Sequence, residues 1–256
     1  MKRGRWISTV LNREPLGSQI VRELRLDIFF GRLAPGEQLF QEALCLRFST
    51  SRMPVRDALR QLVYEGLVES LPGNRLRVAE LNRVDLFDMF WMEATVHAVA
   101  TKRATARVGS HQDDMAELEG LQVRMMGCSS HGDMVEASRI NRIFHRKINL
   151  MAESPKLIAT LRNVSMGIQG SFIAEVPDWL QRSIEEHGAI LDAMREGRAD
   201  DASELMFLHV QASGIKIAND VGRGEGEPLS EETVRNLYPR WMSDLLEKAD
   251  GGADRG

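Results

Sequence analysis

The chain has 256 residues, 43% of them hydrophobic and 27% charged, which is typical of a globular protein with one large domain or two small ones. Two cysteines are too few for a disulfide framework or a zinc finger, and no apolar run approaches the ~20 residues that span a bilayer, so we expect a cytoplasmic protein without membrane contact. The net charge of -4 is unevenly divided: residues 1–78 carry +5 and the remainder -9, which favours a basic DNA-binding head on an acidic body.

The first residues, 1–14, mix basic and polar types without periodicity and predict a flexible arm. An amphipathic helix should follow from about residue 16 and end near Gly31. After a Leu-Ala-Pro-Gly-Glu turn, the pattern predicts a short second helix over about 41–48.

A third helix is predicted over residues 51–67. Ser51 can cap its first turn, Pro54 lies inside that turn where no backbone donor is lost, and Gly66 marks its end. One face is apolar and consists of Val55, Ala58, Leu59, Leu62 and Val63. A second face carries arginines four residues apart, namely Arg52, Arg56 and Arg60. Their guanidinium groups can reach base edges or phosphates, although a solvated basic face on an ordinary helix has the same pattern.

The turn at residues 48–51 joins the last two helices into a helix-turn-helix, and residues 67–78 predict two strands around the turn Pro72-Gly73-Asn74. Together these elements predict a winged helix-turn-helix. Segments 31–39, 51–59 and 65–68 resemble the GntR family of bacterial transcription regulators. The resemblance implies that Arg52 and Arg56 contact operator DNA and that the wing turn at Pro72 and Gly73 enters the minor groove.

Arg60 joins this DNA-binding set from its place on the helix face, and Ser51 and Arg75 complete the set. Two positions depart from the family pattern. Ser49 stands in the turn where glycine is usual, and a small polar residue can adopt that bend at some cost. Glu42 stands where some relatives carry a basic residue that contacts bases, and its carboxylate would meet phosphates badly unless it faces away.

Beyond a linker at residues 79–82, long helical patterns predict an all-α bundle, so the whole chain is expected to be mainly α with one small β-wing. We assign residues 15–80 to the winged helix-turn-helix domain, 83–220 to the helical effector-binding and dimerisation domain, and 221–256 to a linker and tail. The predicted body helices end near 106, cover 115–125, and span 134–151, 157–175, 179–196 and 199–218. A last helix is predicted over 231–248.

Three histidines lie in predicted helices of this body: His145, His187 and His209. Asn141 precedes His145 by one helical turn, so the two side chains project from the same face. Imidazoles from several helices of a bundle can converge on one divalent ion, although histidines scattered along helices more often serve as partnered core or surface residues.

These segments resemble the FCD domain of FadR-type members of the GntR family. The resemblance implies that Asn141, His145, His187 and His209 hold a divalent metal ion, zinc or nickel, on the floor of an effector pocket. Asn141 stands where Asp is common, which predicts weaker metal binding. Glu93 and His97 stand where relatives often have Arg and Glu, and together with Asn141 they are the expected effector-contacting residues.

The expected function is therefore a ligand-responsive repressor of a metabolic operon that binds two half-sites of operator DNA as a homodimer and senses a small metabolite. A metal-dependent all-α enzyme is the alternative, because an imidazole-bound ion with an open position is also a hydrolytic site. Against it, the nearest carboxylate, Glu186, adjoins His187 and should point elsewhere on the helix. A purely structural metal is a third alternative.

Overall fold

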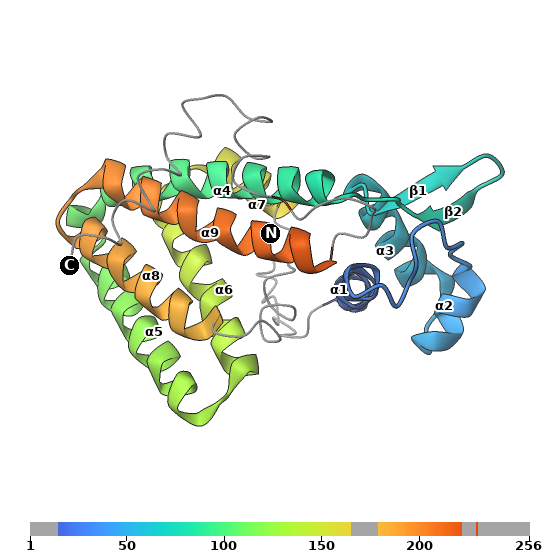
Figure 1. Cartoon of the computed structure of the whole chain (residues 1–256), viewed down its shortest axis with the longest axis horizontal. Helices are drawn as coiled ribbons and strands as arrows, with labels where there is room; N and C mark the ends of the chain where they lie inside the picture. Colours follow the sequence, from blue (N-terminus) through green and yellow to red (C-terminus); the bar gives the residue numbers. More distant parts are fainter. Residues whose placement is uncertain (1–14, 165–178, 222–228, 230–256) are drawn as a thin grey trace, which may run out of the picture. The chain divides into compact units, whose positions relative to one another are not determined.

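The structure is a computed structural model that describes residues 15–164, 179–221 and 229, and it divides into two compact units (Figure 1). The first unit contains residues 15–28 and 32–79, and the second contains residues 29–31 and the described residues from 80 onward. The predicted arm over 1–14 and the predicted last helix over 231–248 lie outside the described residues. No helix in the described ranges is long and apolar enough to cross a membrane.

The first unit is a winged helix-turn-helix, as the sequence predicts. Its elements are α1 (Leu16–Phe29), α2 (Gln41–Arg47), α3 (Arg52–Tyr64), β1 (Val68–Leu71) and β2 (Arg75–Val78). The two strands pair antiparallel, with Val68 opposite Val78, and the backbone just before α2 adds a bridge between Gln38 and Arg77. Helices α1 and α3 each bury an apolar stripe, and α2 and the strands add buried residues such as Leu44, Val68 and Val78 to the same unit's core.

Helix α3 confirms the predicted apolar face, because Val55, Ala58, Leu59 and Leu62 are buried, whereas Val63 is half-buried. Ser51 occupies the N-cap position with extended backbone, but the prediction that its side chain caps the helix is wrong. The usual donors to such a cap are the second and third helical N–H groups. The third helical residue is Pro54, which has no N–H, so one of these two donors is missing.

Turns of the first unit place several residues in the left-handed backbone region. Ser49, between α2 and α3, has φ of 49°, which explains why glycine is the residue expected there. At the wing turn, Gly73 and Asn74 have φ of 79° and 58°, a conformation that these two residue types adopt most readily. The predicted wing turn is therefore built from residues suited to its backbone.

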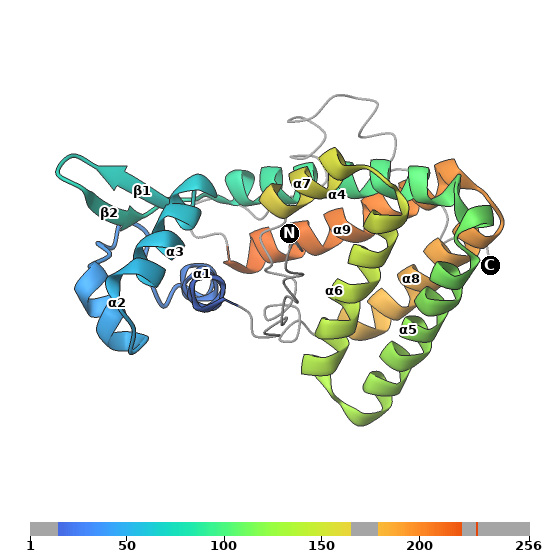
Figure 2. The ribbon, with the colours of Figure 1, turned by 180° about the vertical axis from the view of Figure 1, so that it is seen from behind.

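The second unit is an all-α bundle (Figure 2). It contains α4 (Arg83–Thr105), a 3-10 turn η1 (Val108–Ser110), α5 (Gln112–His131), α6 (Met134–Met151), α7 (Pro155–Val164), α8 (Trp179–Arg195) and α9 (Ala199–Val221). Helix α6 has the predicted bounds. Helix α7 is described only to Val164, and the rest of the helix predicted over 157–175 lies outside the described residues.

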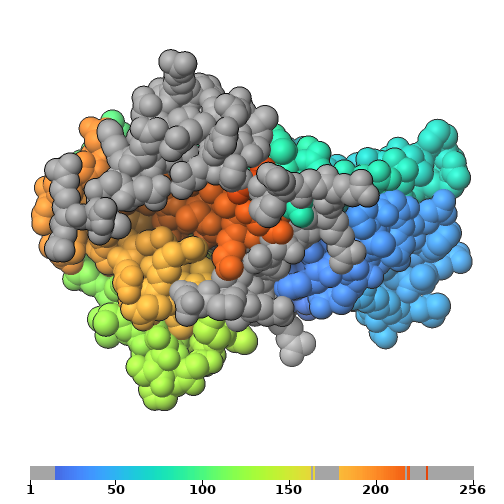
Figure 3. All heavy atoms as spheres, in the orientation of Figure 1, coloured from blue at the N-terminus to red at the C-terminus, as the bar shows by residue number. Residues whose placement is uncertain are grey.

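The long helices α4 and α9 pack side by side along the body (Figure 1). Helix α8 lies beside α9, and their light-orange and dark-orange surfaces adjoin in Figure 3. Gly214 on α9 permits the close approach, because a Cβ atom built there would lie 2.3 Å from the Cβ atom of Phe90 on α4. Nearby, the rings of Trp91 and Phe207 meet edge to face at 4.9 Å between centroids. These contacts make α4 and α9 a tightly packed helix pair within the bundle.

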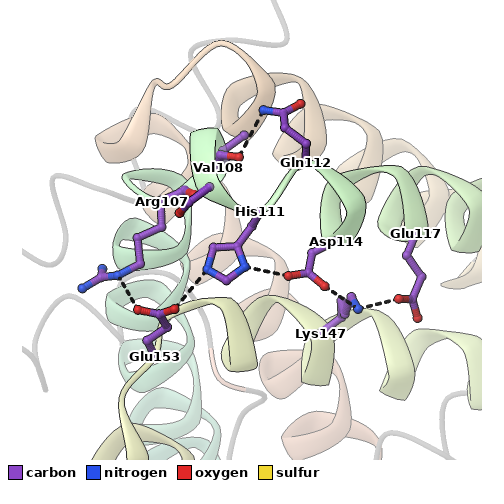
Figure 4. A network of polar contacts seen from close by, with 9 residues as sticks. Arg107, Val108, His111, Gln112, Asp114, Glu117, Lys147 and Glu153 are labelled. Atoms are coloured by element: carbon purple, nitrogen blue, oxygen red, sulfur yellow. Dashed lines mark hydrogen bonds and ion pairs between the residues drawn. The ribbon is translucent and has the colours of Figure 1, made fainter.

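A network of polar contacts joins η1, α5 and the end of α6 (Figure 4). His111 lies between two carboxylates, with its Nδ1 atom 2.6 Å from Asp114 and its Nε2 atom 3.2 Å from Glu153. Lys147 pairs with Asp114 at 2.7 Å and also with Glu117. These side chains are at least partly exposed, so the network fixes geometry more than it adds stability.

Candidate nucleic-acid interface and metal centre

All three arginines of the predicted reading face are exposed on α3: Arg52, Arg56 and Arg60. Two large side chains of the same helix are also exposed, Met53 at 65% and Tyr64 at 69%. An amphipathic helix with one buried stripe and a cationic, partly apolar outer face is suited to the major groove, where guanidinium groups can bind base edges. Ser51, just ahead of this face, is exposed as well.

Helix α3 is held in place by an ion pair from α1. The Arg25 guanidinium donates from Nε and Nη2 to the two oxygens of Glu65, at 3.2 and 2.7 Å, and both side chains are nearly buried. Glu65 is the C-cap residue of α3, so this fork-to-fork contact fixes the end of the reading helix. The buried Asp27 of α1 similarly pairs with Arg47 at the end of α2.

The predicted wing contacts Pro72, Gly73 and Arg75 are exposed at the tip between β1 and β2. Arg75 donates from Nε to the carbonyl of Pro72 at 3.2 Å, which holds its stem against the turn. Glu42 does not face away from this surface, because its Oε1 atom accepts a hydrogen bond from Nη2 of Arg52 at 2.8 Å. A carboxylate therefore lies within the arginine face.

In the body, the structure brings the three predicted metal-binding histidines together. His145 from α6, His187 from α8 and His209 from α9 are all buried, and they are the one group of potential metal ligands found among the described residues. The Nε2 atom of His209 lies 3.2 Å from that of His145 and 3.3 Å from that of His187. Phe144 stacks on His187 at 4.0 Å between ring centroids, which fixes that imidazole.

The protonation of the cluster favours metal binding. Burial, followed by the neighbouring imidazoles, holds the pKa of His145 well below its ordinary value, and burial likewise lowers the pKa of His187. Both rings are therefore neutral near pH 7, the form that binds metal ions. Glu186 was expected to point elsewhere, but its Oε2 atom lies 2.6 Å from Nδ1 of His209. A long side chain on α8 reaches the outer edge of this ring on α9, which leaves Nε2 as the free donor atom.

The donor set fits a divalent ion. Two nitrogens bound to one ion at about 2.0–2.1 Å lie roughly 3.0–3.3 Å apart, close to the two separations seen here. Asn141, one turn before His145, is buried, and its Oδ1 atom accepts no hydrogen bond among the described residues. A buried carbonyl oxygen without a partner costs free energy unless a cation or water binds it.

The other predicted effector residues are buried beside this cluster. His97 on α4 has its Nε2 atom 3.6 Å from Oε1 of Glu93, and its ring meets that of His145 at 5.1 Å between centroids. His97 and His145 both line a cavity of about 300 Å³ between α4, α6 and α7, a size at the lower end of small-molecule sites. Neither Glu93 nor Asn141 lines it.

Sequence reasoning missed the charge of this cavity. Three guanidinium groups line it, those of Arg142, Arg146 and Arg162, and no acidic residue does. Asn149 also lines it and has a buried Oδ1 atom without a partner among the described residues. A cavity with cationic walls favours an anion. These arginines give no sequence signal, because cations along a helix usually mark a solvated face until the packing of α6 against α7 is known.

Two segments of the chain match known family models. Residues 16–78 match the family model described as bacterial regulatory proteins, gntR family, and residues 88–212 match the FCD domain. The chain is similar to a probable D-xylose utilization operon transcriptional repressor of Paenarthrobacter nicotinovorans, with 26% identity over 79% of this chain and 88% of the relative. It is 24% identical to an Nta operon transcriptional regulator of Aminobacter aminovorans, over 69% of this chain and 82% of the relative.

Among solved structures, the E. coli protein McbR/YncC has a similar fold, with a TM-score of 0.62. The match covers 81% of this chain and 99% of that one, at 21% sequence identity. The agreement shows the same architecture of an N-terminal winged helix-turn-helix and a helical C-terminal domain.

Proposed function

Because this chain belongs to the GntR family of bacterial regulatory proteins and carries an FCD domain behind its DNA-binding domain, we propose that it is an effector-responsive repressor of a metabolic operon. Its family makes it a DNA-binding transcription regulator and not an enzyme, so the enzymatic alternative is dropped. Because the proposed target is chromosomal DNA, the proposed place of action is the cytoplasm. We further propose that it acts as a homodimer on an operator with two related half-sites and that its body holds a metal-containing metabolite site.

The observation that supports DNA reading most directly is the exposed arginine face of α3, held by the Arg25–Glu65 pair. We assign base contacts to Arg52, Arg56 and Arg60, and backbone or minor-groove contacts to Ser51 and to the wing residues Pro72, Gly73 and Arg75. An arginine can donate two hydrogen bonds to the O6 and N7 atoms of guanine, which gives sequence specificity.

For the body, the convergent Nε2 atoms and the unpartnered Asn141 oxygen support a metal held by Asn141, His145, His187 and His209. Imidazole suits both zinc and nickel, so zinc or nickel is the proposed ion. The ion would supply a fixed positive charge that anchors an effector's acid group. Asn141 contributes a neutral oxygen, so the ion is held less tightly than by an Asp at that place.

The arginine-lined cavity next to His145 supports an anionic effector, with Arg142, Arg146 and Arg162 as its cationic partners. The apolar residues Leu150, Ile158 and Leu161 line the same cavity and would contact a short carbon chain. We therefore propose a small metabolite with at least two acid groups, one toward the histidine cluster and one toward the guanidinium groups. His97 lines the cavity and also contacts the ring of His145 in the histidine cluster. Glu93, which lies beside His97, would position its ring.

Operator binding tests the assignment of the reading helix. Selection of the full-length protein on a randomised duplex pool yields the operator, and Arg56→Ala should then weaken operator binding by ~10-fold or more, because one bidentate base contact is lost. Arg22→Ala is the matched control, since it removes the same charge from α1 and should change affinity little. Operator binding by Arg56→Ala equal to that of Arg22→Ala would contradict the assignment.

A further inference from the structure

Glu42 is the one acidic residue seen to contact the arginines of the reading face among the described residues. It lies in the first turn of α2, while Arg52 begins α3, so the hydrogen bond of 2.8 Å bridges the two helices of the motif. Both side chains are largely exposed, at 80% for Glu42 and 75% for Arg52. The pair is therefore placed where DNA would bind and adds little to folding stability.

Glu42 and Arg52 also line one groove of about 310 Å³ together with Asn74 and Arg75 of the wing. The carboxylate thus shares this groove with a cation of the reading helix and a cation of the wing. DNA bound to this surface brings phosphates close to Glu42, and two like charges at short range repel each other. A negative charge at this place costs affinity for any DNA backbone.

We propose that Glu42 is a specificity-determining residue, which keeps Arg52 directed at base edges and penalises its use as a phosphate clamp. An arginine has five N–H donors, so Arg52 can donate to Glu42 from Nη2 and still offer others to a guanine edge. A base edge is uncharged, so this arrangement keeps the Arg52–Glu42 pair intact. A phosphate contact instead forces a carboxylate and a phosphate together.

Specificity is a difference between two affinities, and a repulsive group can enlarge it by weakening the wrong complex more than the right one. In this chain the inference deepens the proposed function, because it names what makes the arginine face selective. It also explains how the DNA-reading surface can tolerate the acidic residue Glu42 at a position where some relatives carry a basic residue.

Glu42→Gln tests the inference in the full-length protein. The probes are the duplex selected by the wild-type protein and a scrambled duplex of the same length, each titrated at a fixed salt concentration. Glu42→Gln should bind the scrambled duplex more tightly and lower the ratio of the two affinities by ~10-fold. Glu23→Gln is the matched control, because it removes one negative charge from α1, and its ratio should stay at the wild-type value.

A second arm asks whether Glu42 acts through Arg52. In an Arg52→Ala background, Glu42→Gln should leave the affinity ratio unchanged, because the side chain that it directs is absent. An undiminished effect there, or a ratio in Glu42→Gln equal to that in Glu23→Gln, would overturn the inference. The proposed function fails in a different way: a wild-type protein without any preferred duplex overturns both.

Discussion

The exposed face of α3 and the buried histidine cluster of the body both gather nitrogen-rich side chains, yet they are built on opposite principles. On α3, the arginines lie in water, and Arg52 already has a carboxylate partner. In the body, three buried imidazoles and the buried Asn141 oxygen converge, and several of their polar atoms have no partner among the described residues. A solvated charge is stable before its partner arrives, whereas a buried and unsatisfied donor set gains most from a ligand.

The largest expected effect therefore comes from metal binding to the body. Zinc present at ~100 times its dissociation constant should stabilise the protein by ~2.7 kcal/mol. Scanning calorimetry or dye-based melting of chelator-stripped protein, with and without zinc, measures the rise in Tm. His187→Gln and His209→Gln should lose that rise, while His131→Gln, whose ring lies on the exposed end of α5, should keep it.

An equal rise in all three variants would mean that zinc binds elsewhere. The same experiment addresses the structural alternative for the metal: a metal that stabilises the body while no acid binds to either the stripped or the loaded form favours a purely structural role. Asn141→Asp should strengthen the zinc effect, since the added carboxylate supplies the charge that the amide lacks.

A smaller effect is expected in the head, where Ser49 holds the left-handed backbone between α2 and α3. Glycine adopts this conformation without a Cβ penalty, so Ser49→Gly should raise the free energy of unfolding by about 1 kcal/mol. Urea denaturation followed by circular dichroism measures it. Ser70→Gly in strand β1 is the control and should destabilise, and a destabilised Ser49→Gly would show that the turn carries no strain.

The smallest effect is expected from the partly exposed polar network around His111 and Lys147 (Figure 4). Hydrogen bonds from Lys147 and then from His111 lower the pKa of Asp114 below 3.8. A carboxyl whose folded pKa is depressed stabilises the fold above its unfolded pKa, and this contribution disappears as the pH falls through 3.8 toward the folded value.

Lys147→Gln should therefore cost less than about 1 kcal/mol at pH 7, because the pair is partly exposed, and still less at pH 3.5. Urea titrations of both proteins at the two pH values give the difference. A penalty that grows as the pH falls would contradict the assigned direction of the Asp114 shift.

Local patterns made the helices predictable. The bounds of α6 follow from its apolar repeat, and the wing follows from turn residues that tolerate positive φ. The convergence of the histidines was reached through resemblance, since their spacing along the chain carries no signal. The contact of Glu186 with His209 and the cationic cavity were missed, because both depend on how neighbouring helices pack. The predicted Ser51 cap was wrong, because Pro54 in the first turn of the same helix has no N–H to donate.

The central claim is that effector binding in the body is coupled to operator binding by α3. Operator affinity measured with and without effector tests this coupling most directly. Short dicarboxylates and tricarboxylates, screened by thermal shift on the zinc-loaded protein, supply the ligand. The anisotropy of labelled operator should then show binding weakened by roughly 5- to 150-fold at saturating acid, the usual range of allosteric coupling. Arg146→Gln should blunt this response, and Arg124→Gln, which lies outside the cavity, should not. An acid that binds the body but leaves operator affinity unchanged would contradict the account.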